Sequence, residues 1–530
     1  MASLIPGRAS GGSALPSIRK AALAIALLAS GACAGERASS RNAPAAAAHG
    51  GGLAPRQARS LPLTAPVGLG LDAAGNTYLA GTLFSNAPVD FAGRTVKPLG
   101  DGNLLLASLD PRGNVRWLEA IGDANPDNVA SAAGTAVTQD GRMAVIGRFS
   151  GQLTFGVATV ESAKDVDLVA AVDASSGARL WARKLDEGSN GSILAIAANP
   201  RSPSNRIAVC GTASAAAKDL VPGATFGGGI HDLVIGVFDS AGNRLWSAQI
   251  GGPGYESCTA LAMDDAGDVY AAGQFDGASI TFPGSTPVTL SGPGSAARKA
   301  MWIAKFRGAG EGGAASTLAA VAFQGAAGLA RPNALALDPA GALLVAGYFS
   351  SSLSFTGAPC SAGADPAPAG CLLGAGSTDA FVAKLQPSAG FTAAWAVRLG
   401  GTGRDEAYGV AAGGRDVVAV GRVSTSPPSF RSANGGKDTT GAARLGTSGT
   451  GNPDAFLLRL DGETGATRFA GAYGDGRVQQ ADAVAASGAG ATAQVVVTGT
   501  LGGSATFGSA GTVTAAGAGV GAFLLFAGLE

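Results

Sequence analysis

Histidine is nearly absent from this chain, and that limits the chemistry its side chains can do. Of 530 residues only two are histidines, His49 in an Ala/Gly-rich stretch and His231 just before an apolar run. A Ser/His/Asp triad or a His-rich metal site is therefore hard to build. We expect His231 to be a partly exposed loop residue. The sequence predicts no catalytic residue, no metal and no cofactor.

Carboxylates could still act without histidine, as the paired acids of glycosidases do. The adjacent acids Asp264-Asp265 and Asp405-Glu406 are the candidates. Neighbouring side chains on a strand point to opposite faces, so neither pair is expected to converge on a substrate. The turn 264–268 offers three carboxylates, but calcium needs six to eight oxygens, so a structural hairpin is favoured. An acid-residue hydrolase remains a third alternative for the function.

Composition indicates a folded chain that carries no excess of positive or negative charge. Basic and acidic residues number 37 each, and 46% of residues are hydrophobic. Such a chain is too apolar to be disordered throughout. A net charge of zero offers little attraction to nucleic acid or to anionic membrane surfaces. The 84 Gly and 26 Pro predict frequent turns.

The N-terminus has the pattern of an export signal. Arg8, Arg19 and Lys20 precede the apolar run 21–29, which is too short to span a bilayer. Residues 34–58 are mainly Ala, Gly, Ser and Arg, a composition typical of a flexible tether. We therefore expect an extracytoplasmic protein.

Two forms of processing remain open within residues 1–33. Residues 32–34 are an A-x-A site, which would release a soluble secreted or periplasmic protein. Residues 30–33 resemble a bacterial lipobox, which would leave Cys33 lipidated. In that case the protein is an outer-membrane or cell-surface lipoprotein, and Cys33 is its only membrane attachment.

One unit recurs seven times over residues 59–530, each with four anchors in the same order. The first anchor is a short apolar run that ends in glycine: Gly81, Gly147, Gly211, Gly273, Gly347, Gly421 and Gly499. A Phe, a strand-like run and a second aromatic residue follow it in most units. The seventh unit ends at Glu530 without its last aromatic anchor.

Each unit has the pattern of four strands. In the second unit, runs 134–139 and 142–149 flank the turn Asp140-Gly141, and two further runs flank the turn 175–177. With no helical periodicity, the fold class expected is all-β: a seven-bladed β-propeller of four-stranded antiparallel blades. Since the seventh unit lacks a fourth strand, we expect residues 56–63 to pair with it and close the ring.

Tryptophan recurs at one position of the unit, between apolar neighbours, at Trp117, Trp181, Trp246 and Trp395. An exposed row of this kind could form a sugar-binding platform. Placement on strands favours packing between blades instead.

Two stretches carry a family resemblance. Residues 400–424 (GGTGRDEAYGVAAGGRDVVAVGRVS) and 251–277 (GGPGYESCTALAMDDAGDVYAAGQFDG) resemble the SBBP-type β-propeller repeat of bacterial secreted and surface proteins. The resemblance covers roughly residues 64–530 and is closest in units four to six. It implies a propeller outside the cytoplasm and does not imply a reaction.

A second, partial resemblance concerns residues 168–185 (LVAAVDASSGARLWARKL). This stretch is similar to the repeat of pyrroloquinoline-quinone propellers, which outer-membrane assembly lipoproteins of the BamB type share. It implies a Trp docked between blades, and we draw no quinone site from it.

The remaining cysteines fit an exported protein. Cys360 and Cys371 flank a Pro/Gly/Ala-rich loop within one unit, and we expect a disulfide that pins the loop. Cys210 and Cys258 lie on predicted strands of adjacent units. Either a disulfide or two buried thiols would suit them.

Function is expected on one face of the propeller. Links between the second and third strands, and links between blades, share a face that holds the insertions 212–230, 283–299, 356–378 and 424–453. We predict that this loop face binds a ligand, unless its loops are merely solvated. The candidate contacts are Asn125, Asp127, Tyr255, Glu256, Arg298, Lys299, Arg404, Asp405, Tyr408, Arg431, Lys437 and Arg477.

The favoured function is a non-enzymatic scaffold, exported or envelope-anchored, that binds an envelope or extracellular protein as a monomer. A carbohydrate-binding surface protein is the alternative, with a polysaccharide as ligand. It requires exposed aromatic side chains, and only 6% of residues are aromatic.

Overall fold

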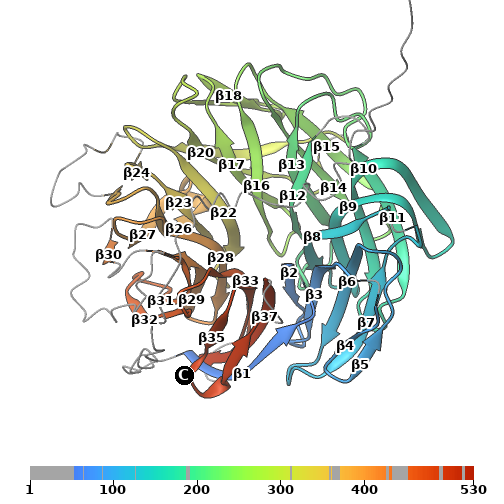
Figure 1. Ribbon diagram of the computed structural model, residues 1–530. Coiled ribbons are helices and arrows are strands. Elements are labelled where there is room, and N and C mark those ends of the chain that lie inside the picture. The colour runs from blue at the N-terminus through green and yellow to red at the C-terminus, as the bar shows by residue number, and fades with distance from the viewer. Residues whose placement is uncertain are drawn as a thin grey trace, which may run out of the picture. The chain divides into compact units, whose positions relative to one another are not determined.

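A computed structural model describes residues 53–63, 65–85, 87–125, 127–186, 191–310, 313–356, 360, 370–424, 429–432, 452–488, 493–515 and 520–529. These residues form a seven-bladed β-propeller of four-stranded antiparallel sheets, as the repeats predicted (Figure 1). They include no helix long and apolar enough to cross a membrane.

The strands of each blade follow one another in the chain from the channel outwards. Blade 1 consists of β2 (Ala65–Leu71), β3 (Thr77–Leu83), β6 (Asn103–Leu109) and β7 (Val115–Ile121). Blade 2 consists of β8 (Ala130–Val137), β9 (Arg142–Phe155), β10 (Ala158–Asp173) and β11 (Arg179–Asp186). Blade 3 consists of β12 (Ser192–Ala197), β13 (Ile207–Ala213), β14 (Asp232–Phe238) and β15 (Arg244–Ile250).

Blades 4 to 6 repeat the pattern. Blade 4 consists of β16 (Glu256–Met263), β17 (Val269–Phe275), β20 (Ala300–Phe306) and β21 (Thr317–Phe323). Blade 5 contains β22 (Ala330–Leu337), β23 (Leu343–Phe349), β26 (Asp379–Gln386) and β27 (Thr392–Gly400). Blade 6 consists of β28 (Glu406–Gly413), β29 (Asp416–Val423), β31 (Asp454–Asp461) and β32 (Thr467–Tyr473). Blade 5 gains a fifth, outermost strand, β30 (Ser429–Ser432).

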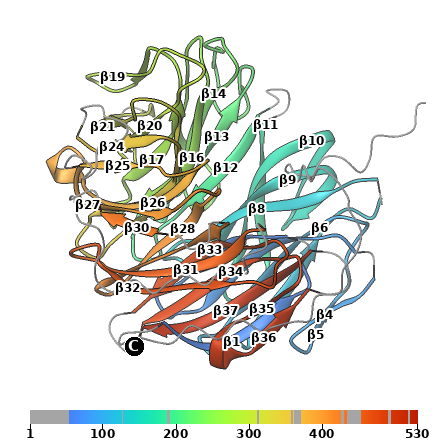
Figure 2. The same ribbon diagram turned by 60° about the vertical axis from the view of Figure 1, so that its left-hand side comes forward.

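Blade 7 is assembled from both ends of the described chain. Its inner strands are β33 (Gln479–Ser487), β34 (Gln494–Leu501) and β37 (Gly521–Leu529), and its outer strand is β1 (Leu53–Leu61) (Figures 1 and 2). Pairing is antiparallel, from Leu53 opposite Leu529 to Leu61 opposite Ala522. This is the closure that the missing seventh-unit strand led us to expect.

The propeller begins earlier than composition suggested. β1 starts at Leu53, inside the stretch 34–58 that we assigned to the tether. An added edge strand is held by main-chain hydrogen bonds, so it needs few large apolar residues. Only Leu53 and Leu61 of β1 are fully buried. Its small and polar residues therefore resemble a linker in the sequence.

Deleting residues 54–64 should lower the melting temperature by roughly 10 °C or more, because blade 7 loses its outer strand and the buried side chains of Leu61 and Leu63. Differential scanning calorimetry of the full chain and of this deletion measures the change. A control that lacks residues 36–50 but keeps β1 should melt like the parent. Equal melting of all three proteins would contradict closure by β1.

The recurrent tryptophans pack between blades, as predicted. Each indole Nε1 donates to a backbone carbonyl of the next blade's third turn: Trp117 to Ala174 (2.9 Å), Trp181 to Ser240 (2.9 Å), Trp246 to Gly308 (3.0 Å) and Trp395 to Gly462 (3.2 Å). A glycine with positive φ lies against each ring. A Cβ at Gly465, for example, would lie 2.8 Å from Trp395. The same contact thus locks successive blades together.

Gly465→Ala should destabilise the protein more than Gly390→Ala, although both glycines have positive φ (74° and 65°). An Ala at either position bears a backbone cost of about 1–2 kcal/mol. At Gly465 overpacking against Trp395 adds about 1–3 kcal/mol, whereas a Cβ at Gly390 would meet nothing within 4 Å. Urea unfolding measures both changes, and equal losses would show that the Trp dock is loose.

Short hairpins occupy several links between the second and third strands. They are β4 (Val89–Phe91) with β5 (Arg94–Val96), β18 (Ser279–Phe282) with β19 (Val288–Ser291), β24 (Ser352–Ser354) with β25 (Cys371–Leu373), and β35 (Ser504–Thr506) with β36 (Thr512–Thr514). The recurrent Phe91, Phe282 and Phe507 are buried, and Phe282 packs on Trp302. Part of the insertions therefore covers the blades themselves.

Two disulfides are present. Cys360 and Cys371 are bonded, as predicted, with their Cα atoms 5.8 Å apart. Cys210 and Cys258, for which the sequence left a disulfide or two buried thiols open, are also bonded, with their Cα atoms 5.7 Å apart. This second bond joins β13 to β16 and so links blade 3 covalently to blade 4.

Candidate functional site

The predicted contacts fall into two clusters and several isolated loop positions. Tyr255, Glu256 and Lys299 come together where blades 3, 4 and 5 adjoin. Arg404 and Tyr408 come together at the start of blade 6. Lys437 and the proposed lipid site Cys33 lie outside the described residues, and Arg431 lies on the edge strand β30.

The first group, here called the blade-4 cluster, comprises Tyr255, Glu256, Asp276 and Lys299. The Lys299 ammonium lies 3.5 Å from the Tyr255 ring centroid and 3.4 Å from Asp276 Oδ2. Asp276 Oδ1 accepts the backbone N–H of Tyr255 at 2.8 Å. The cation is thus held between an aromatic face and a buried carboxylate, which fixes its position.

His231 supports this cluster from blade 3. Its ring meets Tyr255 edge to face, with centroids 5.5 Å apart, and His231 and Tyr255 form a parallel β-bridge. Its side chain is half-buried, close to the partly exposed loop residue we expected. We assign it the role of a packing residue beneath Tyr255.

Glu256 lies beneath the cluster and is almost fully buried. Burial raises its pKa from 4.5 to about 7; Asp232 and Asp276 add to the rise, whereas Lys299 and the backbone N–H of Gly252 oppose it. That N–H donates to Glu256 Oε2 at 3.0 Å. Glu256 therefore organises the cluster from below, and burial leaves its side chain little surface for the contact with a partner that we predicted.

The second group, here called the blade-6 cluster, comprises Arg404, Glu406, Tyr408 and Arg422. Glu406 accepts hydrogen bonds from Arg404 Nε (2.6 Å) and from the Tyr408 hydroxyl. Arg422 Nη2 lies 2.7 Å from the same carboxylate. Glu406 has a side-chain exposure of 2%, whereas Arg404 is 59% exposed. A buried anion thereby fixes one cation that faces solvent, Arg404, and one that is largely buried, Arg422.

Glu406 also affects its phenol neighbour. Burial and the negative charge of Glu406 raise the pKa of the Tyr408 hydroxyl, and Arg422 partly opposes them. The phenol therefore stays protonated and can donate to Glu406. Burial of that carboxylate without three donors would be costly.

Asp405 and Glu406 diverge, as their adjacency on a strand predicted. Asp405 accepts the backbone N–H groups of Gly401 (3.1 Å) and Ser424 (2.8 Å) and is fully buried. Asp123 and Asp475 accept backbone N–H groups at the corresponding links of other blades. Asp405 therefore holds the link in place, and burial leaves its side chain little surface for the predicted contact with a partner.

Other predicted contacts also bond to the loops themselves. Arg298 Nη2 donates to Gly325 O at 2.9 Å, and Arg477 Nη1 donates to Gly502 O at 3.2 Å. Asn125 Oδ1 accepts the backbone N–H of Asp127 at 3.0 Å. These residues are partly or fully exposed, and the two arginines each join their own link to another link of the loop face.

Sequence reasoning missed Asp276 and Arg422, and it weighed Glu406 only as one of a pair of catalytic acids. A signal was present for Arg422: the residue after the recurrent glycine is polar in every unit, namely Thr82, Arg148, Thr212, Gln274, Tyr348, Arg422 and Thr500. It lies on the second strand, opposite the start of the innermost strand. A polar residue there, on an otherwise apolar strand, marks the loop-face end of each blade.

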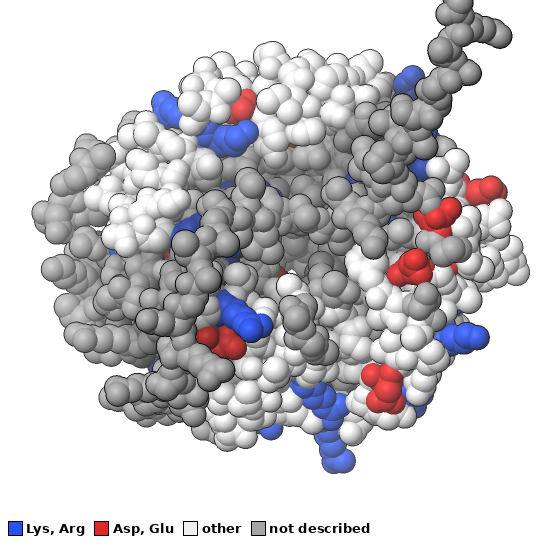
Figure 3. Space-filling view, in the orientation of Figure 1, with Lys and Arg blue, Asp and Glu red and all other residues white. Residues whose placement is uncertain are grey.

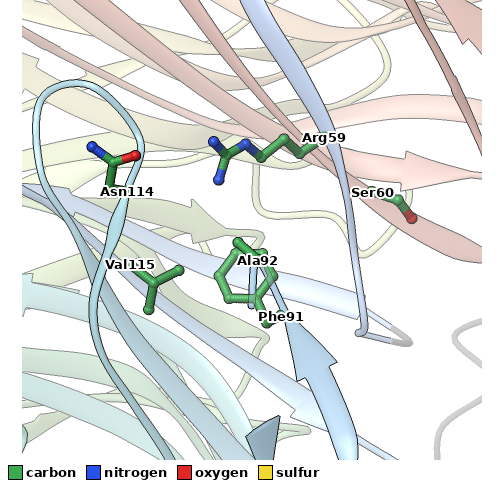
Figure 4. A pocket seen from close by; sticks show the side chains of 6 residues that line it. All are labelled: Arg59, Ser60, Phe91, Ala92, Asn114 and Val115. Atoms are coloured by element: carbon green, nitrogen blue, oxygen red, sulfur yellow. The ribbon is translucent and has the colours of Figure 1, made fainter. Parts of the chain in front are cut away.

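A cavity of about 580 Å³ lies away from both clusters, where β1 meets blade 1. Figure 4 shows Arg59 and Ser60 of β1 beside Phe91, Ala92, Asn114 and Val115. Arg59 Nη1 donates to Gly113 O at 2.8 Å. Its guanidinium thus joins β1 to blade 1 and supports ring closure.

Within the described ranges, no three His, Cys, Asp or Glu side chains gather closely enough to hold a metal ion. Asp264 and Asp268, which we weighed as calcium ligands, both lie beside Lys305 Nζ, at 2.9 and 3.2 Å. An ammonium group thus takes the place that a cation would need in this turn.

Comparison with known proteins identifies no family. The sequence matches no protein-family model and no curated protein. Among solved structures the chain is similar to quinohemoprotein alcohol dehydrogenases from Pseudomonas putida HK5 (12% identity, TM-score 0.36) and Comamonas testosteroni (14% identity, TM-score 0.35). Each of these matches covers 90% of this chain and 76% of the dehydrogenase. It is also similar to a protein of unknown function from Dyadobacter fermentans (10% identity, TM-score 0.34). That match covers 75% of this chain and 93% of the other. Likeness at this level carries no inference about function.

Stability should fall as pH rises from about 4.5 to about 7, since Glu256 keeps its proton in the folded state after the unfolded chain has lost it. Glu256→Gln should flatten this fall, by roughly 5 °C of melting temperature across the window. Asp379 and Asp482, with pKa values raised by burial to about 6 and 7, titrate in the same range, so part of the slope should remain.

Melting curves at half-unit pH steps measure this slope. Glu463→Gln, which removes an exposed carboxylate, serves as the control and should keep the parent's slope. An unchanged slope in Glu256→Gln would show that Glu256 is ionised like a surface acid.

Proposed function

We propose that this protein is an extracytoplasmic β-propeller of the SBBP type that binds a protein partner through its loop face and does not catalyse a reaction. The observation that carries the proposal is the common design of the two clusters. In each, a buried carboxylate holds a cation and a tyrosine on the loop face. Fold alone would not support a function, since propellers serve many.

The exposed side chains of the clusters are of the kinds that dominate protein interfaces. Arginine and tyrosine are enriched among residues whose loss weakens binding most. Arg404 is 59% exposed and Lys299 25% exposed, whereas their partners Glu406 and Asp276 are 2% and 6% exposed. Because the carboxylates already fix these cations, binding would cost less side-chain entropy than it would for free ones.

The surface favours a protein over nucleic acid or sugar. Figure 3 shows charges of both signs scattered among uncharged residues, without a continuous basic patch on the described part of the surface in view. The recurrent tryptophans are buried. Among large hydrophobic side chains exposed in the described residues, Phe84 is the single aromatic. A stacking platform for sugar rings is therefore poorly supported.

The two disulfides support a location outside the cytoplasm, because such bonds persist in oxidising compartments. The export signal supports the same location, and lipidation of Cys33 would anchor the protein to a membrane. A non-catalytic role is supported by Asp123, Asp405 and Asp475, which accept backbone N–H groups in the links.

The test is capture of material from solubilised native envelope by the immobilised full-length chain. One discrete protein should be retained, and Tyr255→Ala/Lys299→Ala or Arg404→Ala should each reduce its retention at least ten-fold. Separate variants are needed because Tyr255 and Arg404 lie in different clusters. Mass spectrometry and glycan analysis would identify the bound material.

Arg112→Ala is the matched control, since Arg112 is an exposed arginine in the Asp110–Gly113 turn at the opposite ends of the strands. It should capture as much as the parent. Equal capture by every variant would remove the loop face from the proposal. Enriched polysaccharide without protein would replace the scaffold with a carbohydrate-binding function.

A further inference from the structure

A cavity of about 200 Å³ lies on the axis of the propeller, lined by residues of all seven innermost strands. Each of these strands has a β-bulge at the same level, two or three residues from its loop-face end. A bulge re-aims the extra residue, and bulges are common next to functional sites. The bulged residues are Val67, Ala133, Leu194, Thr259, Asn333, Tyr408 and Asp482.

The ring of bulged residues is divided into two halves. Ala133 and Leu194, from blades 2 and 3, give the cavity an apolar wall, and Leu194 is 40% exposed there. Asn333 and Tyr408, from blades 5 and 6, give it a polar wall. Asn333 Nδ2 donates to Ala407 O at 2.8 Å, which ties the polar wall across two blades.

The polar wall leads into a group of cations. Tyr408 lines the cavity and donates to Glu406, to which Arg404 and Arg422 are also bonded. Arg422 Cζ lies 5.7 Å from the Tyr408 ring centroid. The Nε atoms of Arg422 and of Arg331, at the equivalent level of blade 5, are buried and have no hydrogen-bond partner among the described residues.

The balance of charge on this side is positive. Within the blade-6 cluster two guanidinium groups, those of Arg404 and Arg422, are bonded to the single carboxylate of Glu406. Asp482, from blade 7, lies near Arg422, but burial raises its pKa to about 7. One positive charge is thus left over in the blade-6 cluster, and a ligand with one negative charge would complement it.

Size limits what can enter. Pockets that enclose a whole small ligand usually measure about 300–1,000 Å³. The axial cavity, at about 200 Å³, is smaller and admits only the end of a longer molecule. That end must present a carboxylate on one side and a small aliphatic group on the other. The C-terminus of a polypeptide has this arrangement.

We propose that the loop-face mouth of the channel binds the C-terminal carboxylate of a protein partner. The carboxylate lies toward Arg404 and Arg422, and the last side chain, Ala, Val or Leu, packs against Leu194 and Ala133. The proposal rests on the proposed function and adds which part of the partner is recognised. A uronic acid shares the carboxylate, but this apolar wall is aliphatic and gives a sugar ring no aromatic surface.

The test uses N-acetylated tetrapeptides that end in Ala, Val or Leu, each as the free acid and as the C-terminal amide, titrated calorimetrically into the full chain. The free acids should bind at least ten-fold more tightly than the amides. Arg404→Gln and Leu194→Asp should each weaken binding of the acids at least ten-fold. Galacturonic acid should bind no better than the amides.

Arg404→Gln removes one of the three donors to the buried Glu406, so its melting temperature is measured beside its binding. Leu194→Asp keeps the test decisive, because Leu194 is 40% exposed and lies outside the Glu406 hydrogen bonds. Arg112→Gln is the control and should bind the acids like the parent. Equal binding of acid and amide, binding of galacturonic acid alone, or no binding of any peptide would overturn the inference.

The two proposals fail separately. If a partner is captured through Tyr255 and Lys299 but the free-acid peptides do not bind, the channel inference is wrong and the scaffold proposal stands. If the free-acid peptides bind as expected but no protein is captured, the mouth recognises carboxylates and the scaffold proposal fails.

Discussion

Every blade of this propeller has two apolar faces that it can cover only with its neighbours, so the ring must close. Closure depends on β1, which pairs along its whole length with β37 and completes blade 7. The guanidinium of Arg59 then joins β1 to the turn at Gly113 of blade 1. A strand from the start of the described chain thus pairs with a strand from its end. The tryptophan contacts likewise hold each of their blades against the next one.

Because the ring is rigid, acidic residues on the loop face can take different roles at nearly equivalent positions. Asp405 is buried and holds a link by accepting two backbone N–H groups. Its neighbour Glu406 points the other way and gathers Arg404, Arg422 and Tyr408. Backbone amides neutralise the first carboxylate, whereas side-chain cations neutralise the second. Only the second arrangement leaves side chains that a partner could contact.

Differences between the repeats matter more for function than their likeness. The bulge on each innermost strand brings one residue of every blade to one level around the axis. Their types change around the ring, from Ala133 and Leu194 to Asn333 and Tyr408. A near-symmetric backbone thereby carries an asymmetric mouth, and asymmetry is what lets such a ring hold one end of a ligand in one orientation.

Local sequence determined the architecture of this protein, because strand alternation, D-x-x-G turns and the seven glycine-ended runs each depend on a few adjacent residues. It also predicted the buried row that includes Trp246 and Trp395, the Cys360–Cys371 bond and a strand near residue 56 that closes blade 7. Tertiary structure alone decided the clusters. Lys299 contacts Tyr255, and Arg422 contacts Glu406, because of how the links pack and how the strands pair. Neither contact can be predicted from the sequence of one segment alone. Burial likewise separated Asp405 from its exposed neighbour Arg404, since the depth of a side chain depends on how neighbouring links pack around it.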